Sequence, residues 1–119
     1  MTRLGRADER KLVGVSPSLV AVVRHVAATY EGSFIVVEGV RTKHRQRELV
    51  RTGKSRTLNS KHLIGDAVDI APLLGHSVSW NWDDFTPLVE AAKRSASTLG
   101  VPMTFGYDWG WDAPHWELK

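Results

Sequence analysis

The feature that most constrains this chain is an aspartate, Asp69, inside an apolar run at residues 65–71. Short apolar runs rich in β-branched residues favour a buried strand. An unpaired carboxylate there is costly, so Asp69 needs a salt bridge, a solvent-facing strand face or a metal ion. Because side chains alternate along a strand, Asp69 shares one face with the small Ala67 and Ala71, which leaves room for an ion and a substrate. Val68 and Ile70 are then expected to face the core.

Two histidines can complete a metal site with Asp69. His62 comes shortly before the predicted strand, and His115 lies in a short extended segment near the end of the sequence. Imidazole and carboxylate ligands suit Zn²⁺, and three protein ligands with a fourth position for water form the catalytic arrangement. The sequence contains no cysteine, so any transition metal must be held by His, Asp or Glu. The residues alone leave a salt bridge or a solvated strand face open as alternatives.

The length and composition fit one domain. A chain of 119 residues can bury a single modest core, and an apolar fraction of 42% with 24% charged residues is ordinary for a soluble globular protein. We expect one domain over residues 1–119, in which residues 1–14 are a charged surface lead-in. The first residues lack the apolar core of a signal peptide, and no segment approaches the length of a membrane span. We therefore expect synthesis in the cytoplasm without membrane insertion.

Start and stop signals predict three helices and three strands. Ser16 and Pro17 begin a helix that reaches about Tyr30, Thr42 caps a helix over 43–52, and Asp83 and Asp84 begin a helix over 84–99. The strands are predicted at 34–37, 65–71 and 101–105, with loops at 53–61 and 72–79. The basic loop at 53–61 lies directly before His62 and can form one wall of a cleft.

The spacing of the chemically active residues resembles that of the VanY-type zinc peptidases, which cleave peptidoglycan stem peptides. Two separated blocks carry the resemblance: Ser60, His62, Gly65, Ala67 and Asp69, then Asp112 and His115. Within that group the chain particularly resembles the phage L-alanyl-D-glutamate endopeptidases, or endolysins. The resemblance implies a small α+β domain of the Hedgehog/DD-peptidase type, with a short, mainly antiparallel sheet and about three helices. It also implies one Zn²⁺ per chain, held by His62, Asp69 and His115.

The resemblance assigns further roles. Arg41 lies at a strand-to-helix junction, where the residues alone leave it equally a solvated arginine or a site residue. In the family an arginine in this context polarises the scissile carbonyl, and a glutamine follows it five residues later. Arg41 and Gln46 match these two positions, and we expect Gln46 to contact the substrate. Ser60 has the family's position for a substrate contact near the metal. Trp109, in an aromatic loop between two glycines, resembles a Gly-x-Asp-Trp element of the family and can line a cleft.

Two carboxylates near His115 compete for the role of general base. Asp112 lies three residues before His115, with Pro114 between them, a spacing that turns its carboxylate back toward the metal. Many relatives carry glutamate at this position, and several phage members carry aspartate. Glu117 shares a strand face with His115 by alternation. We favour Asp112 as the base and Glu117 as the partner that orients the histidine.

Three alternatives accompany the endopeptidase hypothesis. A D-alanyl-D-alanine carboxypeptidase or dipeptidase would share every motif residue, and a metal-containing but inactive wall-binding domain would share the fold. A nucleic-acid binder using the basic segment 41–56 lacks a recognised reader motif, and we expect no nucleic-acid partner. The expected partner is the peptidoglycan stem peptide, bound by a monomer that reaches the cell wall through a separate membrane pore.

Overall fold

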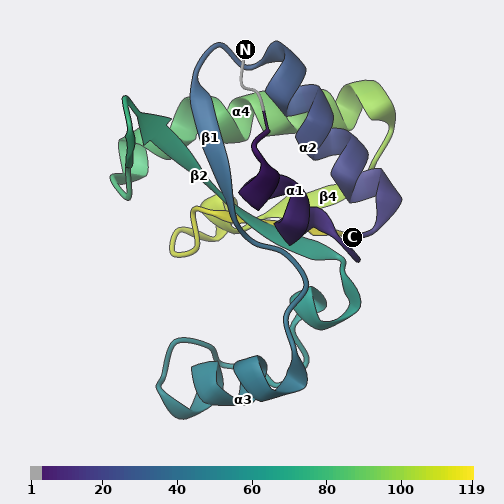
Figure 1. Ribbon diagram of the computed structural model, residues 1–119, viewed down its shortest axis with the longest axis vertical. Coiled ribbons are helices and arrows are strands. Elements are labelled where there is room, and N and C mark those ends of the chain that lie inside the picture. The colour runs from purple at the N-terminus through teal and green to yellow at the C-terminus, as the bar shows by residue number, and fades with distance from the viewer. Residues whose placement is uncertain (1–3) are drawn as a thin grey trace.

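An antiparallel sheet arranged around one long strand carries Asp69 and His115, two of the three candidate metal ligands. The computed structural model describes residues 4–119 (Figure 1). The α-helices are α1 (Arg6–Leu12), α2 (Pro17–Thr29), α3 (Lys43–Arg51) and α4 (Trp82–Leu99), and two 3₁₀ helices are η1 (Lys61–Ile64) and η2 (Gly106–Trp109). The strands are β1 (Ser33–Glu38), β2 (Ala67–Leu74), β3 (Ser77–Val78), β4 (Met103–Phe105) and β5 (His115–Leu118). The predicted α+β class with an antiparallel sheet is confirmed, although the described residues form four α-helices instead of about three.

The strand order is β1-β2-β5-β4, and β3 adds a short pairing at the end of β2. Every described pairing is antiparallel. Val36 and Trp116 lie opposite Ile70 and Val68 of β2, and all four side chains are buried. As the alternation predicted, Val68 and Ile70 belong to the hydrophobic core, which leaves Asp69 on the opposite face.

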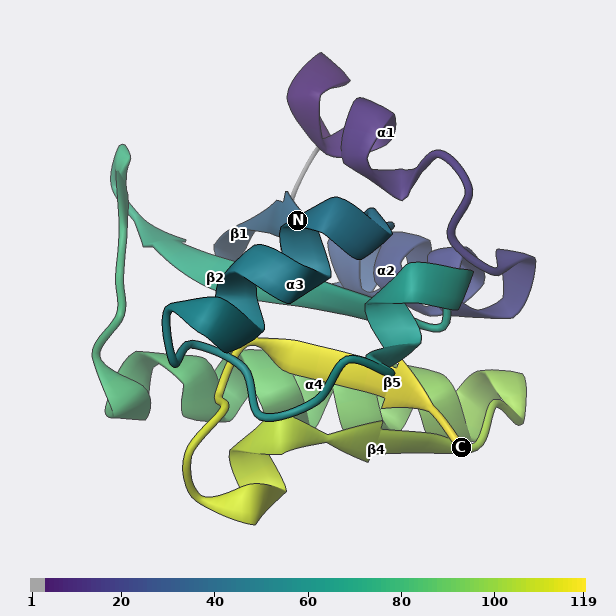
Figure 2. The same cartoon turned by 90° about the horizontal axis from the view of Figure 1, so that it is seen from below.

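Helices α2 and α4 pack against each other and supply the rest of the core. Their buried faces carry residues such as Leu19, Val22, Phe85 and Leu88. In Figure 1 α3 stands apart from these two helices, joined to the sheet by the segments on either side of it, and in Figure 2, seen from below, it lies in front of the sheet. The apolar side of the sheet is therefore occupied by helices, and its other side is free to form a site.

The N-terminal segment is more than the surface lead-in that the sequence predicted. Residues 6–12 form α1, whose Leu12 is buried in the core. The carboxylate of Asp8 accepts a hydrogen bond of 2.9 Å from the backbone N–H of Val36, on the outer edge of β1. An edge strand presents unpaired N–H groups, and Asp8 satisfies one of them. The part of the predicted lead-in at residues 1–3 lies outside the described residues.

The predicted loop over 72–79 is wrong. β2 continues to Leu74 and turns at Gly75 into β3, because β1 offers partners as far as Leu73. Pairing with a neighbouring strand thus keeps Pro72 in β2, although a proline at this position predicted the start of a loop. The start of α4 also differs: Asn81 accepts the N–H of Asp83, so the helix begins at Trp82. Thr42 caps α3 as predicted, accepting the N–H of Arg45 at 3.0 Å.

Ser16 precedes α2, but its hydroxyl does not cap the helix. It donates instead to the carboxylate of Asp66 at 2.5 Å. Among residues 4–119, no helix combines the length and the apolar character that crossing a bilayer requires.

Candidate metal centre

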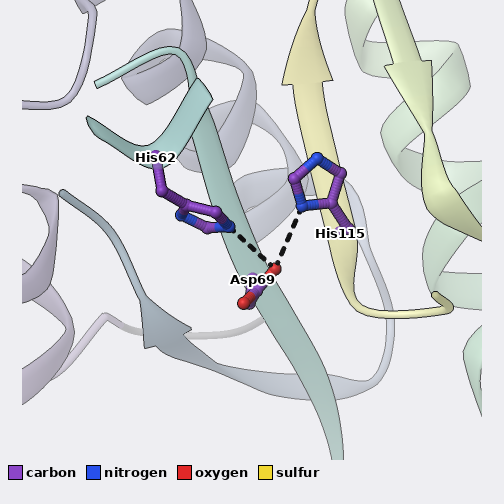
Figure 3. A group of neighbouring side chains, drawn as sticks. All are labelled: His62, Asp69 and His115. Atoms are coloured by element: carbon purple, nitrogen blue, oxygen red, sulfur yellow. Dashed lines mark ion pairs between the residues drawn. The ribbon is translucent and has the colours of Figure 1, made fainter. Parts of the chain in front are cut away.

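Three side chains from three different elements meet on the open face of the sheet. His62 comes from η1, Asp69 from β2 and His115 from β5. Oδ1 of Asp69 lies 3.3 Å from Nε2 of His62 and 3.4 Å from Nδ1 of His115 (Figure 3). One donor atom from each residue lies within 4.8 Å of the others. The ligand set predicted from the sequence is therefore brought together by the fold.

Strand register and a helix cap place these residues. Asp69 and His115 are directly opposite each other in the β2–β5 ladder, so their side chains leave the sheet on the same face. His62 is set by η1, whose first N–H groups are capped by Ser60: its hydroxyl oxygen accepts the backbone N–H of His62 at 3.2 Å. Ser60 thus helps to position a ligand, and it also lines the cleft.

Hydrogen bonds determine which nitrogen of each imidazole faces Asp69. Nδ1 of His62 lies 2.9 Å from the carbonyl oxygen of Gly39, and Nε2 of His115 lies 2.8 Å from Oε1 of Glu117. Both partners are acceptors, so each of these nitrogens must carry the proton. In the neutral rings the lone pairs are then on Nε2 of His62 and Nδ1 of His115, the two atoms that face Asp69.

The site favours a negative charge on Asp69. Burial opposes its ionisation, but the contacts with His115 and His62 outweigh burial and hold the pKa of Asp69 well below its usual range. For His115 burial works against protonation, and Asp69 and Glu117 together raise its pKa. An ionised carboxylate between two imidazoles is an arrangement that attracts a cation or, without one, a proton.

The donor atoms of the three residues also have a spacing that fits a metal ion. Nε2 of His62 is buried and, among the described residues, has no hydrogen-bond partner, which is a costly state for a polar atom. Zinc donors at about 2.0–2.2 Å in tetrahedral geometry lie about 3.3–3.6 Å from one another. The separations of 3.3 and 3.4 Å from Asp69 to the two histidines match that spacing. The group can therefore hold a metal ion.

The candidate centre lies in a cleft of about 750 Å³. The loop at 53–61 forms one wall, as predicted, and contributes Lys54, Ser55, Arg56 and Thr57. Trp109 and Trp111 contribute to the lining from another part of the chain. The ring of Trp109 lies 5.3 Å from that of His115 and 5.5 Å from that of Trp111. The guanidinium of Arg56 lies 5.7 Å from the Trp111 ring, so the basic loop and the aromatic loop approach each other.

Asp112 lies beside the three candidate ligands. Its Oδ2 is 4.0 Å from Nδ1 of His115, and its side chain is half-buried in the cleft lining. Burial, followed by the nearby charge of Asp69, raises the pKa of Asp112. A carboxylate with a raised pKa in a cleft is suited to accepting and returning a proton.

Arg41 lines the same cleft and is held by two partners. It donates to Glu38 through Nε at 2.8 Å and Nη2 at 3.0 Å, and to Oε1 of Gln46 through Nη1 at 2.7 Å. Gln46 itself is 1% exposed and is not among the residues that line the cleft; it lies behind Arg41. Its amide nitrogen donates to Ser55 and Thr57 in the basic loop.

Glu117 and Glu38 complete the site. Glu117 contacts His115 in the orienting position that the sequence predicted, and Lys61 lies 3.3 Å from its second oxygen. Sequence reasoning missed Glu38 and the carbonyl of Gly39. Only the position of Glu38 at the end of a predicted strand, three residues before Arg41, could have drawn attention to it.

Comparisons with known proteins agree on one family. Residues 1–118 match the family model described as phage L-alanyl-D-glutamate peptidase. The L-alanyl-D-glutamate peptidase of Escherichia phage T5 is 31% identical over 122 residues, covering 98% of this chain and 89% of that protein. The corresponding peptidase of Listeria phage A118 is 28% identical over 78 residues, which is 66% of this chain and 25% of that protein. The crystal structure of the Serratia marcescens L-Ala D-Glu endopeptidase ChiX matches with a TM-score of 0.93 and 39% identity, covering 100% of this chain and 90% of that chain.

Proposed function

Because this chain belongs to the phage L-alanyl-D-glutamate peptidase family, we propose that it hydrolyses the amide bond between L-alanine and D-glutamate in the stem peptide of bacterial peptidoglycan. The family resemblance inferred from motif spacing is confirmed by the match over residues 1–118. One observation carries the proposal: His62, Asp69 and His115 converge on a single point in a cleft that also contains Asp112 and Arg41.

The proposed cofactor is one Zn²⁺, held by Nε2 of His62, a carboxylate oxygen of Asp69 and Nδ1 of His115. Two neutral imidazoles and one carboxylate are a ligand set typical of catalytic zinc. When bound, zinc acts as a Lewis acid that makes water more acidic and polarises a carbonyl group. The hydrogen bonds that the two imidazoles donate to the Gly39 carbonyl and the Glu117 carboxylate support this assignment, because they leave the two required lone pairs free.

Asp112 and Arg41 are the proposed catalytic residues. Asp112 takes a proton from the attacking water and returns it to the amine that leaves. Arg41 donates its remaining N–H groups to the oxygen of the scissile carbonyl as negative charge develops there. Glu117 already has His115 and Lys61 as partners, which favours Asp112 as the base.

The substrate lies along the walls of the cleft. Lys54 and Arg56 form no ion pair with any described residue and can hold substrate carboxylates, while the flat face of Trp109 can pack against the peptide. Glu38 forms ion pairs with Arg41 and, at 3.9 Å, with Arg45, and Glu117 forms one with Lys61. The unpaired cations therefore favour an anionic, D-glutamate-containing peptide.

Mass spectrometry of digested peptidoglycan tests the proposed activity. Purified peptidoglycan incubated with the zinc-loaded protein should yield fragments with a new N-terminal D-glutamate, and Asp112→Asn should yield them at least about 100-fold more slowly. Release of D-alanine without those fragments would instead support the carboxypeptidase alternative. Undigested material would support the inactive wall-binding alternative.

Thermal unfolding tests the metal separately. Zinc at about 100 times its dissociation constant should stabilise the fold by about 2.7 kcal/mol, and this stabilisation should be lost in His62→Ala and Asp69→Asn. His76→Ala is the matched control, because His76 is exposed in the turn before β3. An equal zinc response in His62→Ala and His76→Ala would contradict the proposed ligand set.

We also propose that the protein acts as a monomer at the cell wall, reaching it through a membrane pore formed by another protein. The monomer is supported by the site, since all three candidate ligands come from one chain. The place of action is supported by the family, whose named activity requires a substrate found in the wall. Light scattering of the purified protein in solution checks the first of these points.

A further inference from the structure

We propose that Glu38 is a positioning residue that holds Arg41 off Asp69, so that the carboxylate stays available to a metal ion and the guanidinium to the substrate. The inference rests on the proposed function in giving Arg41 a role at the scissile carbonyl. It concerns a residue outside the predicted site, and it follows from the strand register, the hydrogen bonds of Arg41 and the distance between Arg41 and Asp69.

An irregularity in β1 turns Glu38 toward the cleft. Val36 lies opposite Ile70, but Glu38 lies opposite Asp69, so two residues of β1 span one step of β2. In a regular strand Glu38 would share the face of Val36, which is in the apolar core. The bulge moves it to the face of Asp69, where it lines the cleft. Bulges of this kind redirect side chains next to active sites.

Glu38 and Gln46 together leave part of the Arg41 guanidinium free to donate. Of the five N–H donors of a guanidinium, Arg41 gives two to the carboxylate of Glu38 and one to Gln46. One N–H remains on each terminal nitrogen. The side chain is 9% exposed, so these contacts hold it with little freedom, and a paired carboxylate–guanidinium geometry is strongly directional. Arg41 is therefore held in a fixed position, with two of its N–H groups available to a substrate.

Without Glu38, Arg41 could move closer to Asp69 and pair with it directly. Nη2 of Arg41 lies 3.7 Å from Oδ2 of Asp69, beyond the range of a hydrogen bond. A movement of less than about 1 Å would close that gap to a direct charged hydrogen bond of about 2.7–2.9 Å. Such a bond would neutralise part of the charge on Asp69 and turn the guanidinium away from the scissile carbonyl. Glu38 opposes this movement because it holds Nε and Nη2 through two hydrogen bonds.

Measuring zinc affinity and kinetics of Glu38→Gln tests the proposal. Glutamine keeps the shape of the side chain, but its amide cannot accept both N–H groups, so zinc should bind roughly 10-fold more weakly. The value of kcat should fall up to about 100-fold through misplacement of Arg41, with a smaller change in KM. Glu48→Gln is the matched control: Glu48 pairs with Arg51 at 2.8 Å, also three residues apart, on a solvent-facing part of α3. This control should bind zinc and react as the wild type does.

A double-mutant cycle with Arg41→Met separates positioning from a direct effect of charge. If Glu38 acts through Arg41, adding Glu38→Gln to Arg41→Met should change zinc affinity by no more than about twofold. Equal weakening in both backgrounds would overturn the proposal, because Glu38 would then act on the ion itself. Unchanged zinc affinity and kcat in Glu38→Gln would also overturn it, even if the variant unfolds at a lower temperature.

Two further comparisons keep the result interpretable. Glu38→Asp retains the charge and should recover part of the zinc affinity that Glu38→Gln loses, whereas a variant that simply misfolds gains nothing from the shorter acid. The zinc measurements need no peptidase activity. If the wild type cleaves no L-alanyl-D-glutamate bond, the proposed function fails while the cycle still decides the role of Glu38.

Discussion

The carbonyl oxygen of Gly39 lies 2.9 Å from Nδ1 of His62, and this contact leaves Nε2 of the same ring to face Asp69. Gly39 can occupy this place only because it has no side chain. A Cβ atom there would lie 1.8 Å from the carbonyl oxygen of Lys11, at the end of α1. The backbone that orients a candidate ligand is thus also the backbone against which the N-terminal segment packs.

Gly39→Ala should therefore impair both stability and metal binding. Backbone must shift to remove the clash, and we expect a loss of about 1–3 kcal/mol together with weaker zinc binding. Chemical denaturation and a zinc titration measure the two effects. Gly5→Ala is the control, since its Cβ would meet only the Asp8 carboxylate at 3.7 Å. A zinc affinity unchanged in Gly39→Ala would show that the Gly39 carbonyl does not control the imidazole.

Asp112 and Glu117 should respond differently to removal of their charge. Asp112→Asn should lower kcat by about 100- to 10,000-fold with little change in zinc affinity, because Asp112 is the proposed base. Glu117→Gln should weaken zinc binding by about 10- to 100-fold, because it loosens the orientation of His115. Steady-state kinetics and zinc competition with a chelator check both variants. The reverse pattern would make Glu117 the base.

Arg56 should affect substrate binding more than catalysis. It approaches the ring of Trp111 and has no ion-pair partner among residues 4–119, so it is free to meet a substrate carboxylate. Arg56→Gln should raise KM for an anionic stem peptide by about 3- to 10-fold, equivalent to about 1 kcal/mol for a partly exposed charge, and leave kcat nearly unchanged. Arg47→Gln, an exposed arginine on α3 outside the cleft, is the control. An equal rise in KM in both variants would indicate an effect of net charge alone.

The ion pair between Arg24 and Glu9 should give α1 a stability that depends on pH. Two hydrogen bonds of 2.6 and 2.9 Å join them, and the hydrogen bond from Arg24 lowers the pKa of Glu9 below its ordinary value of 4.5. A lowered carboxylate pKa stabilises the folded state above the unfolded pKa, and the effect disappears as pH falls through the folded value.

Arg24→Gln should consequently unfold at a slightly lower temperature than the wild type at about pH 7, and the difference should shrink at about pH 3. Thermal scans at the two pH values measure this directly. Arg10→Gln, an exposed arginine of α1, should show no such pH-dependent difference. A gap between Arg24→Gln and the wild type that is as large in acid as at neutral pH would contradict the ion-pair explanation.

Much of the candidate site could be predicted from the sequence because its candidate ligands carry strong local signals. A carboxylate in an apolar run needs a partner, which drew attention to Asp69. The alternation of side chains along a strand placed Asp69 on the face opposite Val68 and Ile70. Two histidines at suitable positions in the sequence were the remaining candidate ligands. The caps at Thr42 and Gly100 and the core faces of α2 and α4 were likewise local properties of the chain. These features depend on residues a few positions apart, which is the range over which a sequence pattern carries information.

Only the tertiary structure decided which contacts hold the candidate metal ligands in place. The bulge that turns Glu38 toward Asp69 and the Gly39 carbonyl that orients His62 both depend on contacts between segments far apart in the sequence. The extension of β2 to Leu74 and the docking of α1 on β1 arise in the same way. The sequence by itself thus determined which residues could bind a metal. Packing and strand register decided which of their atoms face one another, because a hydrogen-bond partner across the sheet cannot be read from local spacing.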